Sequence, residues 1–356
     1  MKITKIPGLG NYGHYIDDID FDHLTLEEWL EIGKLHLGGL VTILRNVKIT
    51  KDQYYERIQE FGPFKSSIRS ILAKKYGKNF DAINSDSYKN IDMDPMDLKY
   101  IQNKKFLLEQ TENGNYLVRI SGAFTDSGVP LGAFSNGDVH WHSNESSLLT
   151  FAPLVALLGG TGMIGSSTGF VQTVNYYESL SESFKSELNE MILIHKYIPG
   201  HINDREKDSN FGDAINMRMA FCPIDGVETP LVATSPGGLT GLRYTVNTAV
   251  GIRGMTKKQS DKLFAKIDKE LFKKENIFDH YYQANNDLLL FDNSVTLHRR
   301  LGGNLNRLAY RIQYDPSNLL DRPWYPFAHL PEFNNIYIEE TRNLVKILGL
   351  TNYKLP

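Results

Sequence analysis

Cysteine is almost absent from this sequence, which contains a single one, Cys222, among 356 residues. An intrachain disulfide needs two cysteines, so a disulfide-stapled fold is excluded and a reducing compartment is favoured. Long apolar runs are also missing, because none approaches the ~18 residues that a membrane-spanning helix requires. The stretch 1–7 lacks the apolar core of a secretion signal. We therefore expect a cytoplasmic protein without a membrane partner.

An excess of charge of either sign is a further absence. Lys and Arg number 39 and Asp and Glu number 42, which gives a formal net charge of −3. This balance provides no bulk attraction to nucleic acid, so we expect no nucleic-acid partner. Hydrophobic residues make up 41% and charged residues 23%, as is typical of a globular chain with a sizeable core. We predict one domain over 1–356, and the sequence makes no prediction of the oligomeric state.

Local patterns predict strands in the functional half of the chain and helices at its edges. Helix start signals are Thr25, Thr50 and Thr256, each a residue type that caps helix N-termini. The predicted helices begin at these caps and at Glu178, the last running over 178–196 because its apolar residues recur at i+4 spacing. The predicted strands are 40–44, 116–120, 148–158, 288–291 and 307–314.

Two stretches break these patterns. Residues 64–115 are polar with weak periodicity, which predicts an insertion, and 201–213 are hydrophilic, which predicts a mobile loop. Elsewhere the mixture of strands and flanking helices favours one double-sheet barrel with helices packed outside.

Two histidine-containing segments carry the chemistry. The first is 137–145, Gly-Asp-Val-His-Trp-His-Ser-Asn-Glu, and the second is 292–298, Asp-Asn-Ser-Val-Thr-Leu-His, followed by Arg307 and Arg311. A histidine close to a carboxylate, a distant second histidine and a later arginine are typical of a 2-His-1-carboxylate iron site. Such a site leaves coordination positions open for a cosubstrate and O₂.

In this order of motifs the chain resembles the taurine dioxygenase (TauD/TfdA-like) family of Fe(II)/2-oxoglutarate oxygenases. The resemblance covers most of the chain and includes four further short motifs: Leu44-Arg45-Asn46, Phe61-Gly62, Gly165-Ser166-Ser167-Thr168 and Tyr177-Glu178-Ser179-Leu180. It implies a mainly β fold with flanking helices, namely a double-stranded β-helix, also called a jelly-roll or cupin-like barrel. It also implies Fe(II), 2-oxoglutarate and O₂ as cofactor and cosubstrates.

The resemblance makes His142 and His298 iron ligands, but the third ligand departs from the family pattern of His-x-Asp or His-x-Glu. Here Asn144 stands at that position and Glu145 follows it. On an extended segment His142 and Asn144 share one face, so Asn144 could ligate through its amide oxygen. Glu145 is the alternative if a one-residue bulge turns it toward the metal. If neither ligates, the position stays open, as in family halogenases that have Gly or Ala there, or the barrel has lost iron.

Other residues acquire roles from the same resemblance. Arg311 corresponds to the arginine that pairs with the distal carboxylate of 2-oxoglutarate, a task suited to the planar guanidinium fork. Thr168 would add a hydrogen bond to that carboxylate, and Arg307 would lie near the C1 carboxylate or the substrate. His140 is either an outer hydrogen-bond partner of the iron site or an ordinary exposed or core histidine. Asp138 is either a contact for an amine-bearing substrate or a turn residue.

The sequence therefore predicts a 2-oxoglutarate-dependent dioxygenase that hydroxylates a small-molecule substrate, with an amine-bearing metabolite as the class that Asp138 suggests. The alternatives are a halogenase or desaturase on the same scaffold, and a non-catalytic barrel without iron. The substrate itself is not identified by any motif.

Overall fold

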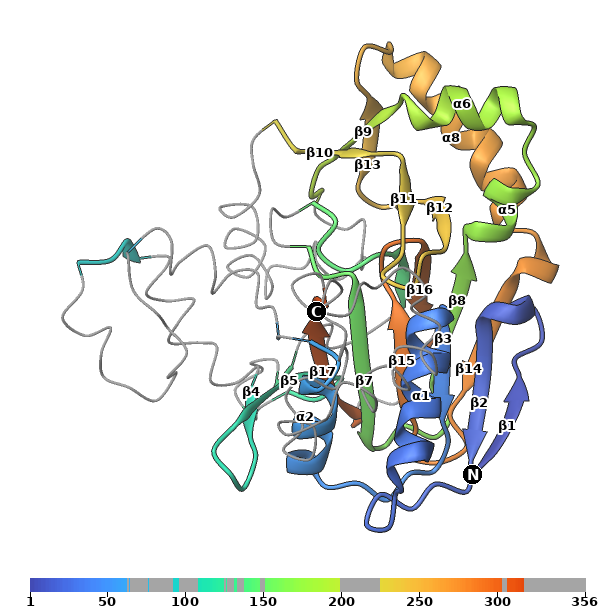
Figure 1. Ribbon diagram of the computed structural model, residues 1–356. Coiled ribbons are helices and arrows are strands. Elements are labelled where there is room, and N and C mark those ends of the chain that lie inside the picture. Colours follow the sequence, from blue (N-terminus) through green and yellow to red (C-terminus); the bar gives the residue numbers. More distant parts are fainter. Residues whose placement is uncertain are drawn as a thin grey trace, which may run out of the picture.

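The computed structural model describes residues 1–62, 64, 76, 92–95, 108–124, 126, 131–132, 138–147, 151–198, 225–302 and 306–316. The predicted insertion at 64–115 lies mostly outside these residues, and the predicted mobile loop at 201–213 lies entirely outside them. Within them the chain is mainly β, as predicted, with a large and a small sheet and helices on the outside (Figure 1).

The large sheet has eight strands, all antiparallel to their neighbours except the parallel pair β2 and β3. Its order is β1 (Lys2–Lys5), β2 (Gly13–Asp17), β3 (Val41–Leu44), β15 (Leu288–Asp292), β7 (Leu154–Thr161), β17 (Leu308–Tyr314), β5 (Tyr116–Ser121) and β4 (Leu108–Gln110).

The second sheet has four strands, in the order β14 (Ile277–Tyr281), β8 (Ser167–Gln172), β16 (Thr296–Arg300) and β6 (Val139–His142). It faces the large sheet, and one buried cluster fills the space between them. Phe170 of β8 contacts Phe291 of β15 there, with ring centroids 5.3 Å apart. Side chains alternate along a strand, so every second residue shares a face. Residues of β17, β8 and β16 on the same face as this cluster therefore also point into the space between the sheets.

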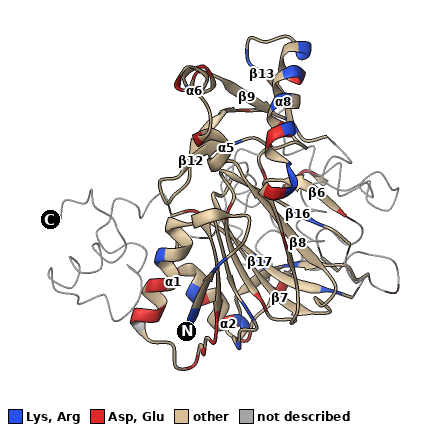
Figure 2. Cartoon of the chain, turned by 90° about the vertical axis from the view of Figure 1, so that its right-hand side faces the viewer, with Lys and Arg blue, Asp and Glu red and all other residues tan. Residues whose placement is uncertain are grey.

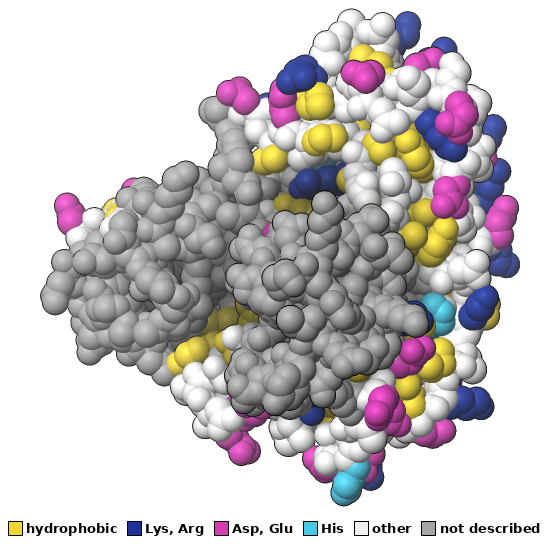
Figure 3. Space-filling model, in the orientation of Figure 1, with side chains coloured by type: hydrophobic (Ala, Val, Ile, Leu, Met, Phe, Trp, Pro, Cys, Tyr) yellow, Lys and Arg dark blue, Asp and Glu magenta, His cyan; other side chains and the backbone are white. Residues whose placement is uncertain are grey.

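The outer face of the large sheet is covered by helices α1 (Leu26–Gly38) and α2 (Lys51–Gln59). Both begin at the predicted caps: Thr25 and Thr50 each form a capping box with the third residue of the helix. In Figure 2 the charged residues are frequent along the helices, whereas most of the strand residues are uncharged. Figure 3 shows basic and acidic side chains interspersed over one face, as the small net charge predicts.

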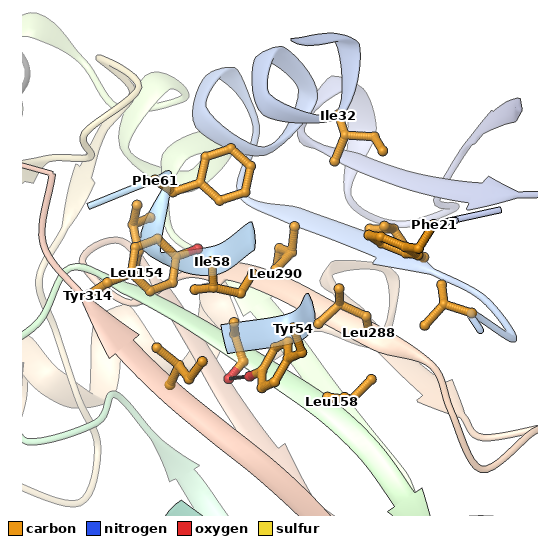
Figure 4. Close-up of a cluster of buried hydrophobic side chains, with 14 of the residues drawn as sticks. Phe21, Ile32, Tyr54, Ile58, Phe61, Leu154, Leu158, Leu288, Leu290 and Tyr314 are labelled. Atoms are coloured by element: carbon orange, nitrogen blue, oxygen red, sulfur yellow. Dashed lines mark hydrogen bonds between the residues drawn. The ribbon is translucent and has the colours of Figure 1, made fainter. Parts of the chain in front are cut away.

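The core under these helices is aromatic and aliphatic (Figure 4). Tyr54 of α2 is fully buried, and its hydroxyl lies 3.0 Å from the carbonyls of both Ala156 and Tyr310. This one phenol therefore ties α2 to the adjacent strands β7 and β17, and β17 carries Arg311 of the site described below.

A smaller region packs on the outside of the four-stranded sheet. It contains the sheet β10 (Val227–Pro230), β9 (Ile192–His195) and β13 (Ala249–Ile252), the hairpin β11 (Val232–Thr234) and β12 (Thr240–Leu242), and the helices α5 (Val174–Glu178), α6 (Glu182–Asn189) and α8 (Lys257–Leu271). A third buried cluster joins α8 and β9 to Val171 and Leu297 of the four-stranded sheet. None of the described helices is long and apolar enough to cross a membrane.

The predicted helix over 178–196 is wrong in its extent. The helix α6 ends at Asn189, and Ile192–His195 is the strand β9. The i+4 apolar spacing ran on into this strand because Ile192 satisfies the helical period by coincidence. Hydrogen bonding to both β10 and β13 decides the local structure in favour of the strand. The strands β1 and β2 were not predicted at all.

Candidate functional site

The two histidines of the sequence motifs are direct partners across neighbouring strands. Antiparallel β6 and β16 place His142 opposite His298, with ring centroids 4.1 Å apart. His298 also contacts Phe291 of the large sheet, with centroids 4.8 Å apart, so the pair faces the space between the two sheets. Directly opposed residues of an antiparallel pair have close Cβ atoms, and this register alone is enough to converge two imidazoles.

Both imidazoles are held in the neutral form that a metal ligand needs. Burial lowers the pKa of His142 to about 4, and burial likewise lowers the pKa of His298 well below its usual value, with His142 and Arg311 adding to the effect. His142 Nδ1 donates to the carbonyl of His140, 2.7 Å away, which leaves Nε2 of His142 as the lone-pair donor. His298 Nδ1 is buried and forms no hydrogen bond with any residue that the structure describes.

The segment after His142 is fixed by the carboxamide of Asn293, a fully buried side chain. Asn293 Oδ1 accepts from Asn144 N at 2.7 Å, and Asn293 Nδ2 donates to Asn144 O at 3.0 Å and to Ala152 O at 2.8 Å. Ser143 Oγ donates to the Asn293 backbone carbonyl as well. One side chain therefore binds both backbone groups of Asn144 and sets the position of this residue beside the histidines.

The turn that presents Asn293 is organised by its neighbour Asp292. Asp292 Oδ1 accepts from the backbone N–H groups of Ser294 and Val295, at 2.9 and 2.7 Å. This turn ends β15 and begins β16, on which His298 lies. The Asp292 side chain is completely enclosed, and burial raises its pKa to about 7 despite the hydrogen bonds that oppose the shift.

Asn144 and Glu145 differ in their relation to the histidines. A hydrogen bond with the Asn144 side chain raises the pKa of His142, against the larger effect of burial, so the amide lies beside the imidazole. Glu145 has a φ of 61°, in the left-handed region, and the backbone reverses there instead of continuing the strand. Among the described residues no three His, Cys, Asp or Glu side chains form a group that could hold a metal ion. Glu145 is thus not gathered with His142 and His298.

Two separate environments surround the predicted arginines. Burial lowers the pKa of Arg307 to about 10, and the charge of Arg307 acts on Tyr282, whose hydroxyl lies 3.0 Å from Thr168 Oγ1. Arg311 instead acts on the two histidines. Both arginines lie in or next to β17, Arg307 within range of Tyr282 and Arg311 within range of the two histidines.

Asp138 and His140 lie at the edge of this site. Asp138 Oδ1 accepts from the backbone N–H of Gly302 at 2.6 Å, and the carboxylate lies near enough to Arg300 to affect that guanidinium's pKa, which burial lowers to about 9. His140 shares its face of β6 with His142, but its ring is exposed and its backbone carbonyl makes the contact with the His142 ring. These contacts tie both residues to the framework around the histidines.

Several residues of the site were not predicted from the sequence. Tyr282, Arg300 and the clamp formed by Asn293 belong to this group. Asn293 did stand in the quoted 292–298 motif, but nothing in the motif indicates that its carboxamide reaches a residue 149 positions away. The buried contact between the hydroxyls of Tyr282 and Thr168 depends on the register between β14 and β8, which the sequence pattern does not specify.

Comparison with known proteins gives a family match over most of the chain. The family model described as "Taurine catabolism dioxygenase TauD, TfdA family" matches residues 3–312. A solved structure, AAD-2 in complex with Mn(II) and N-oxalylglycine, is 17% identical with a TM-score of 0.58, over 88% of this chain and 97% of that one. A taurine dioxygenase from Burkholderia xenovorans is 16% identical with a TM-score of 0.55, over 88% of each chain. These structures share the fold. No curated protein sequence matches significantly.

The buried Asp292 predicts a measurable pH dependence. Its pKa is 3.8 in an unfolded chain and about 7 in the folded one, so between these values the folded state carries a proton that the unfolded state has lost. The free energy of unfolding therefore falls as pH rises through this window, by at most about 4 kcal/mol, and levels off above it. Asp292→Asn removes this pH-dependent contribution. In urea denaturation, the free energy of unfolding of the variant should therefore rise relative to that of the wild type between pH 4 and pH 7.

Asp225 is exposed and provides the control for this prediction. Asp225→Asn should leave the pH profile of the wild type unchanged. A constant difference between Asp292→Asn and wild type across pH 4 to 7 would show that Asp292 is ionised throughout and would refute the prediction.

Proposed function

Because this chain belongs to the Taurine catabolism dioxygenase TauD, TfdA family, a family of 2-oxoglutarate-dependent dioxygenases, we propose that it hydroxylates a small metabolite at an iron(II) site between His142 and His298. The observation that carries the proposal is the direct cross-strand pairing of these two neutral, buried imidazoles. We place this site in the mouth of a double-stranded β-helix barrel, a description that the two facing sheets support.

The residues present fit such a metal. Imidazole nitrogens suit Fe(II), and ligands must be unprotonated to bind it. The hydrogen bond from His142 Nδ1 to His140 O orients the ring, as an outer partner of a metal-bound histidine does. When bound, iron with 2-oxoglutarate and O₂ supplies the oxidising chemistry, while the chain supplies position and exclusion of water. The AAD-2 structure, which holds Mn(II) and N-oxalylglycine, an analogue of 2-oxoglutarate, supports a metal and this cosubstrate here.

We assign the third protein contact to the Asn144 amide rather than to the Glu145 carboxylate. The contact between the Asn144 side chain and His142 supports this choice, as does the clamp by Asn293 on both Asn144 backbone groups. An amide oxygen is neutral, so the two histidines and Asn144 bring no negative charge to the metal. The carboxylates of 2-oxoglutarate would then supply the negative charge next to the metal.

The two arginines bind different carboxylates of the cosubstrate. We assign the distal carboxylate of 2-oxoglutarate to Arg307 and Thr168, because Arg307 acts on the Tyr282 that contacts Thr168. Arg311, whose charge acts on both histidines, then lies at the metal end near the C1 carboxylate. This reverses the order that the family resemblance suggested for the two arginines.

We do not extend the proposal to an amine-bearing substrate. That prediction relied on a carboxylate at Asp138 that could meet a cation from outside the chain. In the structure this carboxylate accepts from Gly302 N and lies within range of Arg300.

Anaerobic titration with Fe(II) and 2-oxoglutarate tests the proposed function. We expect a visible charge-transfer band. On admission of air, succinate should be released, and a screen of metabolites should find a substrate that increases this release. His298→Ala should abolish both while the circular dichroism spectrum is retained. His23→Ala is the matched control, since the His23 side chain is 83% exposed. Normal succinate formation by His298→Ala would refute the site. A requirement for chloride would indicate a halogenase, and failure to bind Fe(II) would indicate a non-catalytic barrel.

The third contact is tested by changing the two neighbouring residues separately. Asn144→Asp adds a negative charge beside the iron, so Fe(II) affinity should rise because carboxylate is a stronger donor than amide. Glu145→Gln should leave Fe(II) affinity unchanged. Metal titration of these two variants and of Asn144→Ala decides between the two residues: loss of iron from Glu145→Gln but not from Asn144→Ala would assign the contact to Glu145.

The division of the arginines is tested by Arg307→Lys and Arg311→Lys, which keep the charge and lose the planar fork. For Arg307→Lys we expect the apparent KM for 2-oxoglutarate to rise about 10- to 150-fold, the equivalent of about 1.5–3 kcal/mol for a hydrogen bond to a charged group. Arg311→Lys should affect the position of the visible band more than the KM. A KM increase confined to Arg311→Lys would restore the assignment suggested by the resemblance.

A further inference from the structure

A buried histidine and a buried aspartate form a pair close to Thr168. His280 Nε2 lies 2.9 Å from Asp287 Oδ2, and the two side chains are only 3% and 2% exposed. An ionised carboxylate accepts hydrogen bonds and donates none, so Nε2 is the donor in this contact. His280 is opposite Thr168 in the register of β14 with β8, and directly opposed residues share one face of a sheet. The pair therefore lies on the same face as Thr168.

The Asp287 carboxylate is anchored to the large sheet. Its Oδ1 atom accepts from Asn46 N at 2.7 Å, and its backbone carbonyl accepts from Gly159 N at 2.9 Å. Asn46 follows β3 and has a left-handed φ of 52°, a conformation that asparagine adopts more readily than most residues. It belongs to the motif Leu44-Arg45-Asn46, for which the sequence indicated no role. Through Asp287, His280 of the four-stranded sheet is thus tied to β3 and β7 of the large sheet.

Tyr282 connects this pair to Thr168. The rings of His280 and Tyr282 meet edge to face, with centroids 4.9 Å apart and an interplanar angle of 70°. The Tyr282 hydroxyl lies 3.0 Å from Thr168 Oγ1, and Tyr282 N donates to Ser166 O at 3.2 Å. Burial raises the pKa of the fully enclosed Tyr282 phenol well above its usual value, so the hydroxyl keeps its hydrogen.

The direction of the hydrogen bond between Tyr282 and Thr168 decides what Thr168 can bind. A threonine hydroxyl has one hydrogen to donate and two lone pairs with which to accept. A phenol is a stronger donor than an aliphatic alcohol, which favours Tyr282 as the donor and Thr168 Oγ1 as the acceptor. The hydrogen of Thr168 is then left for a ligand in the site.

This inference rests on the proposed dioxygenase function. We propose that Asp287, His280 and Tyr282 are positioning residues that set the preference of the site for a 2-oxo acid with a distal carboxylate. Asp287 fixes the His280 ring, the ring holds the Tyr282 side chain, and Tyr282 directs the Thr168 hydroxyl toward the carboxylate assigned to Arg307 and Thr168. The three residues act through Thr168 and not by contact with the metal.

Two matched 2-oxo acids test the inference. 2-Oxoglutarate and 2-oxopentanoate share one carbon chain and one 2-oxo acid group, but only 2-oxoglutarate has a distal carboxylate. The affinity of each is measured by calorimetry with the full-length chain and Fe(II) under anaerobic conditions. Tyr282→Phe keeps the ring and loses the hydroxyl. We expect its 2-oxoglutarate affinity to fall about 3- to 10-fold, the range for one neutral hydrogen bond, and its 2-oxopentanoate affinity to stay unchanged.

Two further variants test the residues that act through Tyr282. His280→Gln keeps an N–H donor for Asp287 but removes the ring beside Tyr282, and Asp287→Asn keeps an acceptor for Asn46 N but removes the charge beside His280. Both should reduce the preference for 2-oxoglutarate over 2-oxopentanoate. Adding His280→Gln to Tyr282→Phe should reduce this preference no further, because His280 acts through the Tyr282 hydroxyl.

Tyr281→Phe is the matched control. Tyr281 is the preceding residue and its side chain is 58% exposed, so loss of its hydroxyl should leave both affinities unchanged. A general loss of folding would weaken both acids together, and the ratio of the two affinities separates this effect from loss of positioning. If His280→Gln or Asp287→Asn fails to fold, Tyr282→Phe still decides the result.

Three outcomes would overturn the inference. The first is an equal loss of affinity for both acids in Tyr282→Phe, and the second is an unchanged preference in that variant. The third is additive losses from Tyr282→Phe and His280→Gln, which would show that His280 does not act through Tyr282. In each case the wild type still forms the visible band with Fe(II) and 2-oxoglutarate, and the dioxygenase proposal stands. A wild type that binds neither acid would overturn the dioxygenase proposal and this inference with it.

Discussion

The pairing of β6 with β16 is the contact on which the rest of the site depends. It sets His142 opposite His298. The hydrogen bonds of the Asn293 carboxamide with the Asn144 backbone reinforce it. Each of these contacts joins parts of the chain that are far apart in sequence, so the large sheet must first place β15 and its terminal turn. The capped helices α1 and α2 serve that requirement, because they cover the outer face of the sheet that carries β15.

Charge is the second constraint on the site. Arg300, Arg307 and Arg311 lie around two neutral histidines, and Asn144 replaces the carboxylate that the family pattern would provide. A divalent metal bound between the two histidines would attract anions to this region. Asp138, the acid at its edge, is already engaged with Gly302.

Sequence patterns predicted those features that depend on neighbours along the chain. The helix caps at Thr25, Thr50 and Thr256 are confirmed, because a cap needs only the residue and the helix that follows it. The mainly β class and the family are confirmed as well. The prediction of a helix beyond Asn189 is wrong, because strand pairing there outweighs the local helical periodicity. The roles of Asn293 and Tyr282 could not be predicted, since each arises from contacts between segments that are distant in sequence.

Distance along the chain gives the clamp at Asn293 a consequence for folding. Its carboxamide spans 149 positions, so the histidine site is a feature of high contact order that closes only when both sheets have met. A metal that binds this geometry has no comparable site in the unfolded chain. It therefore stabilises the native state by mass action, by about 2.7 kcal/mol when its free concentration is a hundred times Kd. The amount of folded protein would then follow the supply of that metal.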